Sequence, residues 1–380
     1  MNVIRTSKED IIAYEQSAAL NQSSIKHILK QGMQSFLKSA LFLRKSEEVD
    51  EEQNKKKKED GDVAHFIIGK GVDTLITGHP GDFDEKYFIS SCINKPTEKP
   101  LAIVKNVYDK VTASFPPGNV ADLAFYRREI YDACNEVEFF MNRRKPEETW
   151  NDDSRINTII TGCATYFDDL CLALTKQVIS QTEKNIIEAL HNSFLNHPNT
   201  GNYFQPSSSK IIIYQMPLYF TYEGVECKAL LDMVIIDLVK GIIRIIDLKT
   251  IGRPVLEFIK QCMTLRYDIQ SSFYSFAMKE NIPIVSQLVD KNLEKFKVVF
   301  AFMAESTRVD QWGTPLIFPM HENLLFGAEH GIHTPKYHLP GWNEGVTKYR
   351  NWMNAEFNID TVIPKGVIAI NDKYEYALNV

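Results

Sequence analysis

The sequence lacks any apolar run long enough to cross a membrane. In 380 residues there is no stretch of about 18 apolar residues, and the N-terminal segment MNVIRTSKED has no apolar core of the kind found in signal peptides. Hydrophobic residues make up 44% of the chain and charged residues 24%, proportions typical of soluble globular proteins. We therefore expect a cytoplasmic protein that has no membrane partner.

Cysteine is scarce, and no two cysteines stand close together. The six cysteines include no CxxC pair, which argues against a zinc site built from thiolates. We expect reduced thiols, most of them buried, at these positions: Cys92, Cys134, Cys163, Cys171, Cys227 and Cys262.

The chain also lacks a net positive charge. Its formal charge of −6 argues against a surface that is basic all over and binds nucleic acid indiscriminately. Positive charge is nevertheless concentrated locally, since residues 240–279 contain seven Lys or Arg against three acidic residues. A local basic groove is therefore compatible with the composition.

The first half of the chain shows mainly helical spacing of apolar residues. This holds for residues 1–46, where Asn21 or Ser23 is a candidate helix cap, and for residues 100–200. The charge run at residues 47–60 predicts a solvated linker; the alternative is that its lysines contact a phosphate backbone. A short apolar helix follows it, with Gly61 and His65 one turn apart on one face. A lone histidine in such a helix is usually a satisfied core residue.

Within residues 205–305, which we expect to form the core of the domain, the spacing of apolar residues changes at residue 210 to the period of strands. The segments SKIIIYQMPLYFTY, VECKALLDMVIID and IIRIIDLKT are rich in β-branched and aromatic residues, which predicts an antiparallel meander. A helix carrying Gln270 and Tyr274 one turn apart comes next, followed by the strand FKVVFAFMAE. Beyond Ser306 we expect mainly loops until a final helix in NEGVTKYRNWMNAEFN.

Two of the predicted strands carry acidic residues in apolar surroundings. Asp247 and Lys249 stand two positions apart and therefore share one face of their strand. Taken alone, such a pair is most often a structural ion pair. On the preceding strand, Asp232 is expected to share a face with Leu230, Val234 and Ile236. If the faces of the two strands coincide, the two carboxylates converge, and a divalent cation such as Mg²⁺ would stabilise both.

The order of these motifs resembles that of the PD-(D/E)XK nuclease superfamily. A G-x-x-x-H helix with His65 comes first, then Asp232, then the D-L-K of Asp247 and Lys249, and finally a Q-x-x-x-Y helix. Within the superfamily the sequence is most similar to the RecE-type (exodeoxyribonuclease VIII) phage-type exonuclease family, over roughly residues 15–355. The similarity includes SSIKHILKQGMQSFLKSA, IIEALHNSFLNHP, VECKALLDMV, YDIQSSFYSFAM and VVFAFMAE.

The resemblance implies one α/β domain over residues 1–380, with a restriction-endonuclease-like core in which helices flank a mixed sheet with an antiparallel catalytic meander. Asp232, Asp247, Lys249, Gln270 and Tyr274 would be the catalytic residues. The expected metal ligands are His65, Asp232, Asp247 and the backbone carbonyl of Leu248. The residues expected to contact DNA are Arg244, Arg253, Lys260 and Arg266.

The activity implied by the resemblance is Mg²⁺-dependent hydrolysis of linear double-stranded DNA from 5′ to 3′, with Mn²⁺ as a substitute. Its setting would be recombination or repair in a bacterial or phage-infected cell. The implied partners are DNA ends, a single-strand annealing protein and further copies of the chain. Two alternatives stay open: an endonuclease or single-strand-specific nuclease at the same site, and a DNA-binding protein of the same fold with weakened catalysis.

Some features depart from the pattern of the superfamily. Related sequences often carry an acidic residue near QMPLYF, where this chain has Gln215, which leaves the binding of a second metal ion open. The iron–sulfur members need three cysteines after the Q-x-x-x-Y helix; because none follows Cys262, we expect no cluster. Four histidines (321, 330, 333 and 338) stand in a Gly- and Pro-rich segment that has no counterpart in the family, so zinc binding there is the less favoured interpretation.

Overall fold

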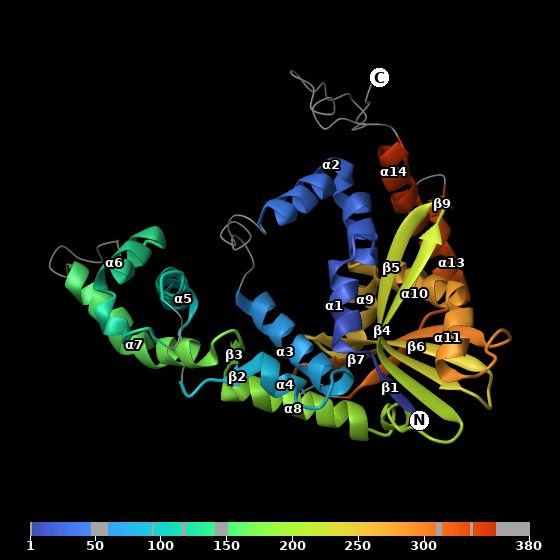
Figure 1. Cartoon of the computed structure of the whole chain (residues 1–380), viewed down its shortest axis with the longest axis horizontal. Helices are drawn as coiled ribbons and strands as arrows, with labels where there is room; N and C mark the ends of the chain where they lie inside the picture. Colours follow the sequence, from blue (N-terminus) through green and yellow to red (C-terminus); the bar gives the residue numbers. More distant parts are fainter. Residues whose placement is uncertain are drawn as a thin grey trace, which may run out of the picture.

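The computed structural model describes residues 2–46, 60–92, 95–115, 119–140, 151–308, 314–334 and 337–354. Within these ranges, helices surround a six-stranded mixed sheet with the strand order β1-β4-β5-β6-β7-β8 (Figure 1). The strands of this sheet are Val3–Arg5 (β1), Lys210–Tyr222 (β4), Val225–Asp237 (β5), Ile242–Ile251 (β6), Lys297–Ser306 (β7) and Leu316–Pro319 (β8). Two small sheets pair Tyr87–Ile89 (β2) with Gln177–Ile179 (β3) and Ile332–Thr334 (β9) with Tyr337–Leu339 (β10).

Strands β4, β5 and β6 form the predicted antiparallel meander. The β4–β5 turn is tight because Glu223 and Gly224 both adopt positive φ angles, as two-residue hairpin turns require. Gly241, also with positive φ, closes the β5–β6 turn. Strand β6 then pairs in parallel with β7, so the prediction of a mixed α/β sheet is confirmed.

Helices cover both faces of the sheet. Their bounds are Lys8–Gln16 (α1), Gln22–Ser46 (α2), Asp60–Thr77 (α3), Asp82–Lys86 (α4), Glu98–Thr112 (α5), Arg127–Glu136 (α6), Asp152–Ala173 (α7), Gln181–Asn196 (α8), Phe258–Thr264 (α9), Tyr267–Glu280 (α10), Ile282–Val289 (α11), Glu322–His330 (α13) and Trp342–Asn354 (α14). Short 3₁₀ turns occupy Leu123–Phe125 (η3), Gly201–Tyr203 (η4) and Val255–Glu257 (η5). On one face, α2, α9, α10 and α14 enclose a core that includes Ile243, Phe273 and Trp342. On the other face, α3 and α8 enclose Val72 and Ile246.

Helices α5, α6 and α7 form an arm that extends away from the sheet (Figure 1). The arm has an apolar core of its own, in which Ile103, Val107, Ile130, Ile159 and Phe167 are fully buried. Among the described residues of the range 100–200, α5, α6, α7 and α8 are helical and β3 is a strand. A capping box begins α8, because the Ser180 hydroxyl accepts from the amide of Glu183 and the Glu183 carboxylate accepts from the amide of Ser180.

The mainly helical character expected for residues 1–46 is present as α1 and α2, but the edge strand β1 precedes them and pairs in parallel with β4. Three residues are too few to show a period. The expectation for the segment after Ser306 is wrong. After Ser306 the chain forms β8, α13 and the β9–β10 hairpin rather than mainly loops. The charged linker predicted for residues 47–60 lies outside the described residues except for its last position, which begins α3. None of the six cysteines, all of which lie in the described ranges, forms a disulfide, and four of them are buried.

In the described part of the chain, no helix is both long and apolar enough to span a bilayer.

One buried acid next to the central strands predicts a pH dependence of stability. Glu305 of β7 is paired with Thr250 and is fully buried, and neither of its carboxyl oxygens has a hydrogen-bond partner of normal geometry among the described residues. Burial therefore raises the pKa of Glu305 from 4.5 to about 7, against a smaller lowering by the Ser193 hydroxyl.

Because the folded protein holds this proton more tightly than the unfolded chain, Glu305 stabilises the fold fully below pH 4.5, and this contribution is lost as the pH rises to about 7. The loss is on the order of 3 kcal/mol. We expect Glu305→Gln to remove this part of the pH dependence and to be more stable than the wild type at pH 8. Urea unfolding at pH 5 and pH 8 measures the free energy of unfolding, with the exposed Glu294→Gln as control. An equal change in this free energy between the two pH values for wild type and Glu305→Gln would contradict the prediction.

Candidate active site

The structure brings Asp232 and Asp247 together where β5 and β6 stop pairing. The last paired residues are Met233 and Ile246, so one step further along the register Asp232 stands opposite Asp247. In place of a ladder bond, the amide of Leu248 donates to Asp232 Oδ2 at 2.9 Å. Two carboxyl groups from neighbouring strands therefore meet at the point where the strands separate.

Lys249 completes the motif. Its Nζ is paired with Asp247 Oδ2 and lies 3.4 Å from the carbonyl oxygen of Leu248. Asp247 is 1% exposed, whereas the Lys249 side chain keeps 20% of its surface in contact with solvent. Burial opposes the charge of Lys249, but Asp247 and Asp232 outweigh it and raise the pKa of Lys249 above its usual value. The ammonium group is therefore charged and held beside the two carboxyl groups.

Helix α10 supplies two more of the predicted residues. Gln270 Nε2 donates to Asp247 Oδ1 at 2.6 Å, while Lys249 occupies the other oxygen. Tyr274 follows one turn later and is buried. Burial and the nearby carboxyl groups of Asp247 and Asp232 raise the pKa of Tyr274, so its hydroxyl keeps its proton. The spacing of Gln270 and Tyr274 thus places both side chains on the helix face that looks toward the carboxyl pair.

The period of β5 breaks beside the site. Leu231, Val234 and Ile236 belong to the same core, so the expectation that Leu230 shares a face with Val234 and Ile236 is wrong. Strand β4 shows the same break at Gln215, which has a φ of 52° and stands opposite Asp232, between the pairs on either side. One residue of each strand is left unpaired, so the register is kept while the alternation of faces shifts by one position. The distortion is local to the carboxyl groups.

The side chain of Gln215 contacts an acidic residue, Asp73 of α3, that was not predicted from the sequence. Gln215 Nε2 donates to Thr77 Oγ1 at 2.8 Å and lies 3.3 Å and 3.4 Å from the carboxylate oxygens of Asp73. Burial raises the pKa of Asp73 to about 6, although the hydrogen bond from Thr77 and the charge of Lys249 lower it. Its position, eight residues after His65 on one helix, is the only signal in the sequence that points to it.

Asp73 is therefore a third acid that acts electrostatically at the site of Asp232 and Asp247. The pKa of Asp232 is raised well above its usual value by burial, by Asp247 and by Asp73, in that order. Such mutual repulsion would be relieved by a cation placed among the three groups. The donors are carboxylate and carbonyl oxygens, the ligands that Mg²⁺ and Mn²⁺ prefer, so the residues present fit such an ion.

The position of His65 can be given only for its backbone, since its side chain lies outside the described residues. It belongs to α3, one turn before Gly69. A Cβ atom on Gly69 would lie 2.8 Å from Thr250 Oγ1, so α3 packs directly against β6, one residue beyond Lys249. The role of His65 as a ligand stays a prediction.

A second lysine, which the sequence analysis also missed, lies close to the site. Lys26 of α2 and Lys249 both stand over the ring of Tyr267, with their Nζ atoms 5.4 Å and 5.3 Å from the ring centre. Burial and the like charge of Lys249 lower the pKa of Lys26 to about 8. Its position in the similar segment SSIKHILK was visible in the sequence, but nothing there indicated proximity to Asp247.

The four basic residues expected to contact DNA are placed differently from one another. Arg253 and Lys260, just after β6 and on α9, are exposed. Arg266 is held internally, by Asp268 and by the carbonyl of Pro340 at 2.9 Å. The Arg244 guanidinium stands over the ring of Tyr203, on the face of β6 opposite to that of Asp247.

Comparisons with known proteins add little to this geometry. No family model matches the sequence, and no curated protein matches it. Among solved structures, the chain is similar to a crystal structure of a protein named "Putative exonuclease" from Eubacterium rectale, with 13% sequence identity. The match covers 74% of this chain and 86% of that chain, with a TM-score of 0.32, which is too low to carry an argument about fold or activity.

Proposed function

We propose that this chain is a metal-dependent nuclease that hydrolyses phosphodiester bonds of DNA. The observation that carries the proposal is the convergence of Asp232, Asp247, Lys249 and Gln270 at the point where β5 and β6 separate. A structural ion pair needs only Asp247 and Lys249. It does not account for a second and a third carboxyl group whose pKa values are raised by the same burial and repulsion.

The residues have distinct roles in the proposed reaction. Asp232, Asp247 and the carbonyl of Leu248 would hold Mg²⁺, which when bound supplies positive charge for the phosphate oxygens and acidifies water. Lys249 orients the attacking water in line with the leaving oxygen and stabilises the charge that develops on the phosphate. Gln270 fixes the carboxylate of Asp247 by donating to its Oδ1, and Tyr274, whose hydroxyl stays protonated, lies one helix turn further on.

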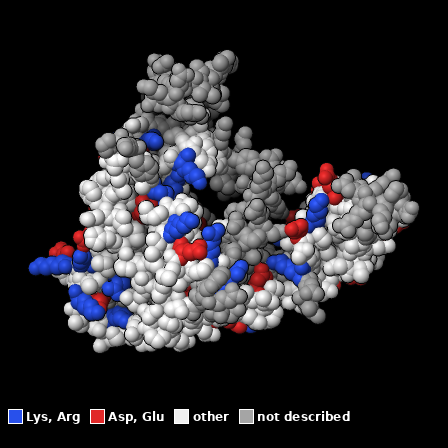
Figure 2. Space-filling model, turned by 180° about the vertical axis from the view of Figure 1, so that it is seen from behind, with Lys and Arg blue, Asp and Glu red and all other residues white. Residues whose placement is uncertain are grey.

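The proposed substrate is linear double-stranded DNA, degraded from 5′ to 3′. This finer assignment is supported by the resemblance of the motif order to RecE-type exonucleases. On the face shown in Figure 2, Lys and Arg side chains, together with some Asp and Glu, lie on the sheet-bearing part and on the helical arm where the two face each other. The basic side chains among them suit contacts with phosphates of a duplex despite the net charge of −6. The further proposals are an annealing protein as partner and a homo-oligomeric assembly.

Cleavage of matched substrates tests the proposal. A 5′-labelled linear duplex, the same sequence as a covalently closed circle, and a linear single strand are incubated with the protein in Mg²⁺ and, separately, in Mn²⁺. The proposal expects nucleotides released from the linear duplex and an intact circle. Cleavage of the circle would favour an endonuclease, and preference for the single strand would favour a single-strand-specific nuclease. Binding without cleavage in either metal would contradict enzymatic function.

A further inference from the structure

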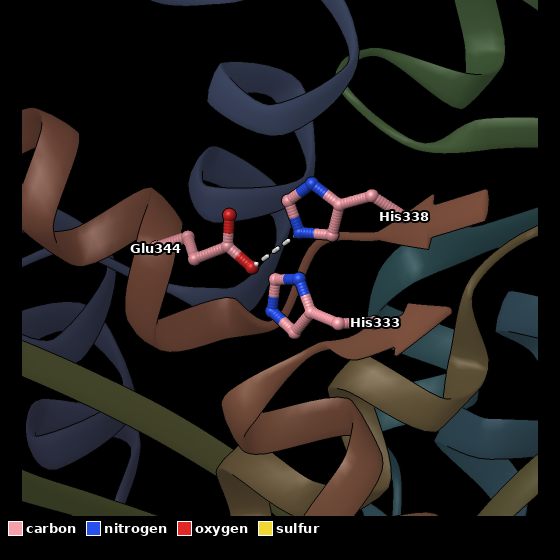
Figure 3. Close-up of side chains that lie close together, drawn as sticks. All are labelled: His333, His338 and Glu344. Carbon is pink, nitrogen blue, oxygen red and sulfur yellow. Dashed lines mark hydrogen bonds and ion pairs between the residues drawn. The ribbon is translucent and has the colours of Figure 1, made fainter. Parts of the chain in front are cut away.

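A second cluster of metal-ligating side chains lies at the base of the β9–β10 hairpin. His333 and His338 stand opposite each other in the hairpin, and their rings are stacked with centres 4.2 Å apart. Glu344, in the first turn of α14, accepts from His338 Nε2 at 3.0 Å (Figure 3). One ligand atom from each of the three residues lies within 4.8 Å of the others.

The cluster is built by close backbone packing rather than by chance proximity of surface side chains. A Cβ atom on Gly331 would lie 2.7 Å from Glu344 Oε1, and one on Gly341 would lie 2.4 Å from the amide nitrogen of Gly331. Gly331 also has a φ of +82°, a conformation that other residues rarely adopt. Only glycine at both positions therefore lets the hairpin approach the start of α14 this closely.

The same packing fixes the carboxylate. Glu344 Oε1 accepts from the amide of Gly341 at 3.0 Å in addition to His338. Burial disfavours ionisation of this group, but those two hydrogen bonds outweigh it and lower the pKa of Glu344. The other two histidines of the segment are placed elsewhere: His321 caps α13, and His330 faces the Asn343 amide at 3.5 Å. Two imidazoles and one ionised carboxylate thus converge.

We propose that His333, His338 and Glu344 form a binding site for Zn²⁺, with water as a further ligand. Two imidazole nitrogens and one carboxylate oxygen are a common three-residue donor set for zinc. At bond lengths near 2.1 Å, such donors lie on the order of 3.4 Å apart, so the present arrangement needs only small side-chain rotations. Imidazole ligands select Zn²⁺ over Mg²⁺, whereas the oxygen ligands near Asp247 select the reverse.

The site connects the hairpin to the helix that carries Gln270. The indole of Trp342, two residues before Glu344, donates to Ser272 of α10 at 3.1 Å. At the start of α10, Arg266 donates to the carbonyl of Pro340. A zinc ion bound to both strands and to α14 therefore stabilises the hairpin against α10. Its role is structural, and it is independent of the metal at the Asp232 and Asp247 site.

Zinc binding by the full chain tests the proposal. Chelator-treated protein is titrated with Zn²⁺ by calorimetry in the presence of millimolar Mg²⁺, and its melting temperature is recorded with and without zinc. We compare the wild type, the double variant His333→Ala with His338→Ala, the single variant Glu344→Gln, and Asp247→Asn. The control is His191→Ala, on α8 and far along the chain from the hairpin.

The proposal expects one zinc ion bound with micromolar or tighter affinity by the wild type, Asp247→Asn and His191→Ala. It expects at least a tenfold loss for Glu344→Gln, no binding at this site by the double variant, and a zinc-induced rise in melting temperature on the order of 3 °C that the double variant lacks. Substituted Co²⁺ should give the visible absorption of a four- or five-coordinate site. Unchanged zinc binding by a folded double variant, or none by the wild type at micromolar zinc, would overturn it.

Discussion

Replacing Lys249 by alanine is expected to lower the rate of DNA cleavage by about a hundredfold to a thousandfold at saturating Mg²⁺ and DNA. The ammonium group lies next to both carboxyl groups and keeps its charge because Asp247 and Asp232 outweigh the effect of burial. Its removal takes away the group that orients water and stabilises charge on the phosphate. Binding of DNA depends on many contacts, so it should change little.

A single-turnover assay with a labelled duplex measures the rate, and fluorescence anisotropy in Ca²⁺ measures the binding. Lys240→Ala is the matched control, since Lys240 lies in the turn before β6 and its side chain is 69% exposed. The control should cleave at the wild-type rate. Cleavage by Lys249→Ala within threefold of wild type would contradict the assigned role. Unfolding of both Lys249→Ala and Asp247→Ala would restore the interpretation of a structural ion pair.

Asp73→Asn is expected to raise the Mg²⁺ concentration needed for half-maximal cleavage by roughly ten- to a hundredfold. Asp73 adds negative charge to the site, and this charge is close enough to Asp232 to raise its pKa. Asparagine keeps the size of the side chain and can still accept from Thr77, so the fold should persist. The measurement is cleavage as a function of Mg²⁺ concentration. Asp84→Asn, on the exposed side of α4, is the control.

The hydrogen bond between Gln215 and Asp73 allows a sharper form of this test. In the double variant Asp73→Asn with Gln215→Glu, the carboxylate moves across the contact from α3 to β4, while the total charge is unchanged. If a third carboxylate at this place supports metal binding, the double variant should recover at least part of the lost Mg²⁺ affinity. A wild-type Mg²⁺ dependence of Asp73→Asn alone would show that this acid has no such role.

Sequence periodicity was sufficient to predict the central part of the fold. Apolar, β-branched segments bounded by YEG and LVKG predict β4, β5 and β6 as a meander, because both the strand period and the turn residues are local signals. Their antiparallel pairing then places Asp232 opposite Asp247. The spacing of Gln270 and Tyr274 is also a local signal, because it places both residues on one helix face. Gln270 donates a hydrogen bond to Asp247, as the predicted site requires.

The features that the sequence could not predict depend on contacts between distant segments. Asp73 reaches the site only because α3 packs on β6 at Gly69, and Gln215, with its positive φ, directs its side-chain amide toward it. Lys26 is more than two hundred residues from Asp247 along the chain. The pairing of His333 with His338 depends on the hairpin register, which no period in so short a strand can show.

The central claim is that Asp232 and Asp247 bind a metal ion with which this chain hydrolyses DNA. Release of acid-soluble nucleotides from linear duplex DNA, in Mg²⁺ and after addition of excess chelator, tests it most directly when wild type is compared with Asp247→Asn. Asp237→Asn, at the end of β5 next to the turn, is the control. We expect release by wild type and by the control in Mg²⁺, none with chelator, and none by Asp247→Asn. Equal release by wild type and Asp247→Asn, or none by wild type in either Mg²⁺ or Mn²⁺, would contradict it.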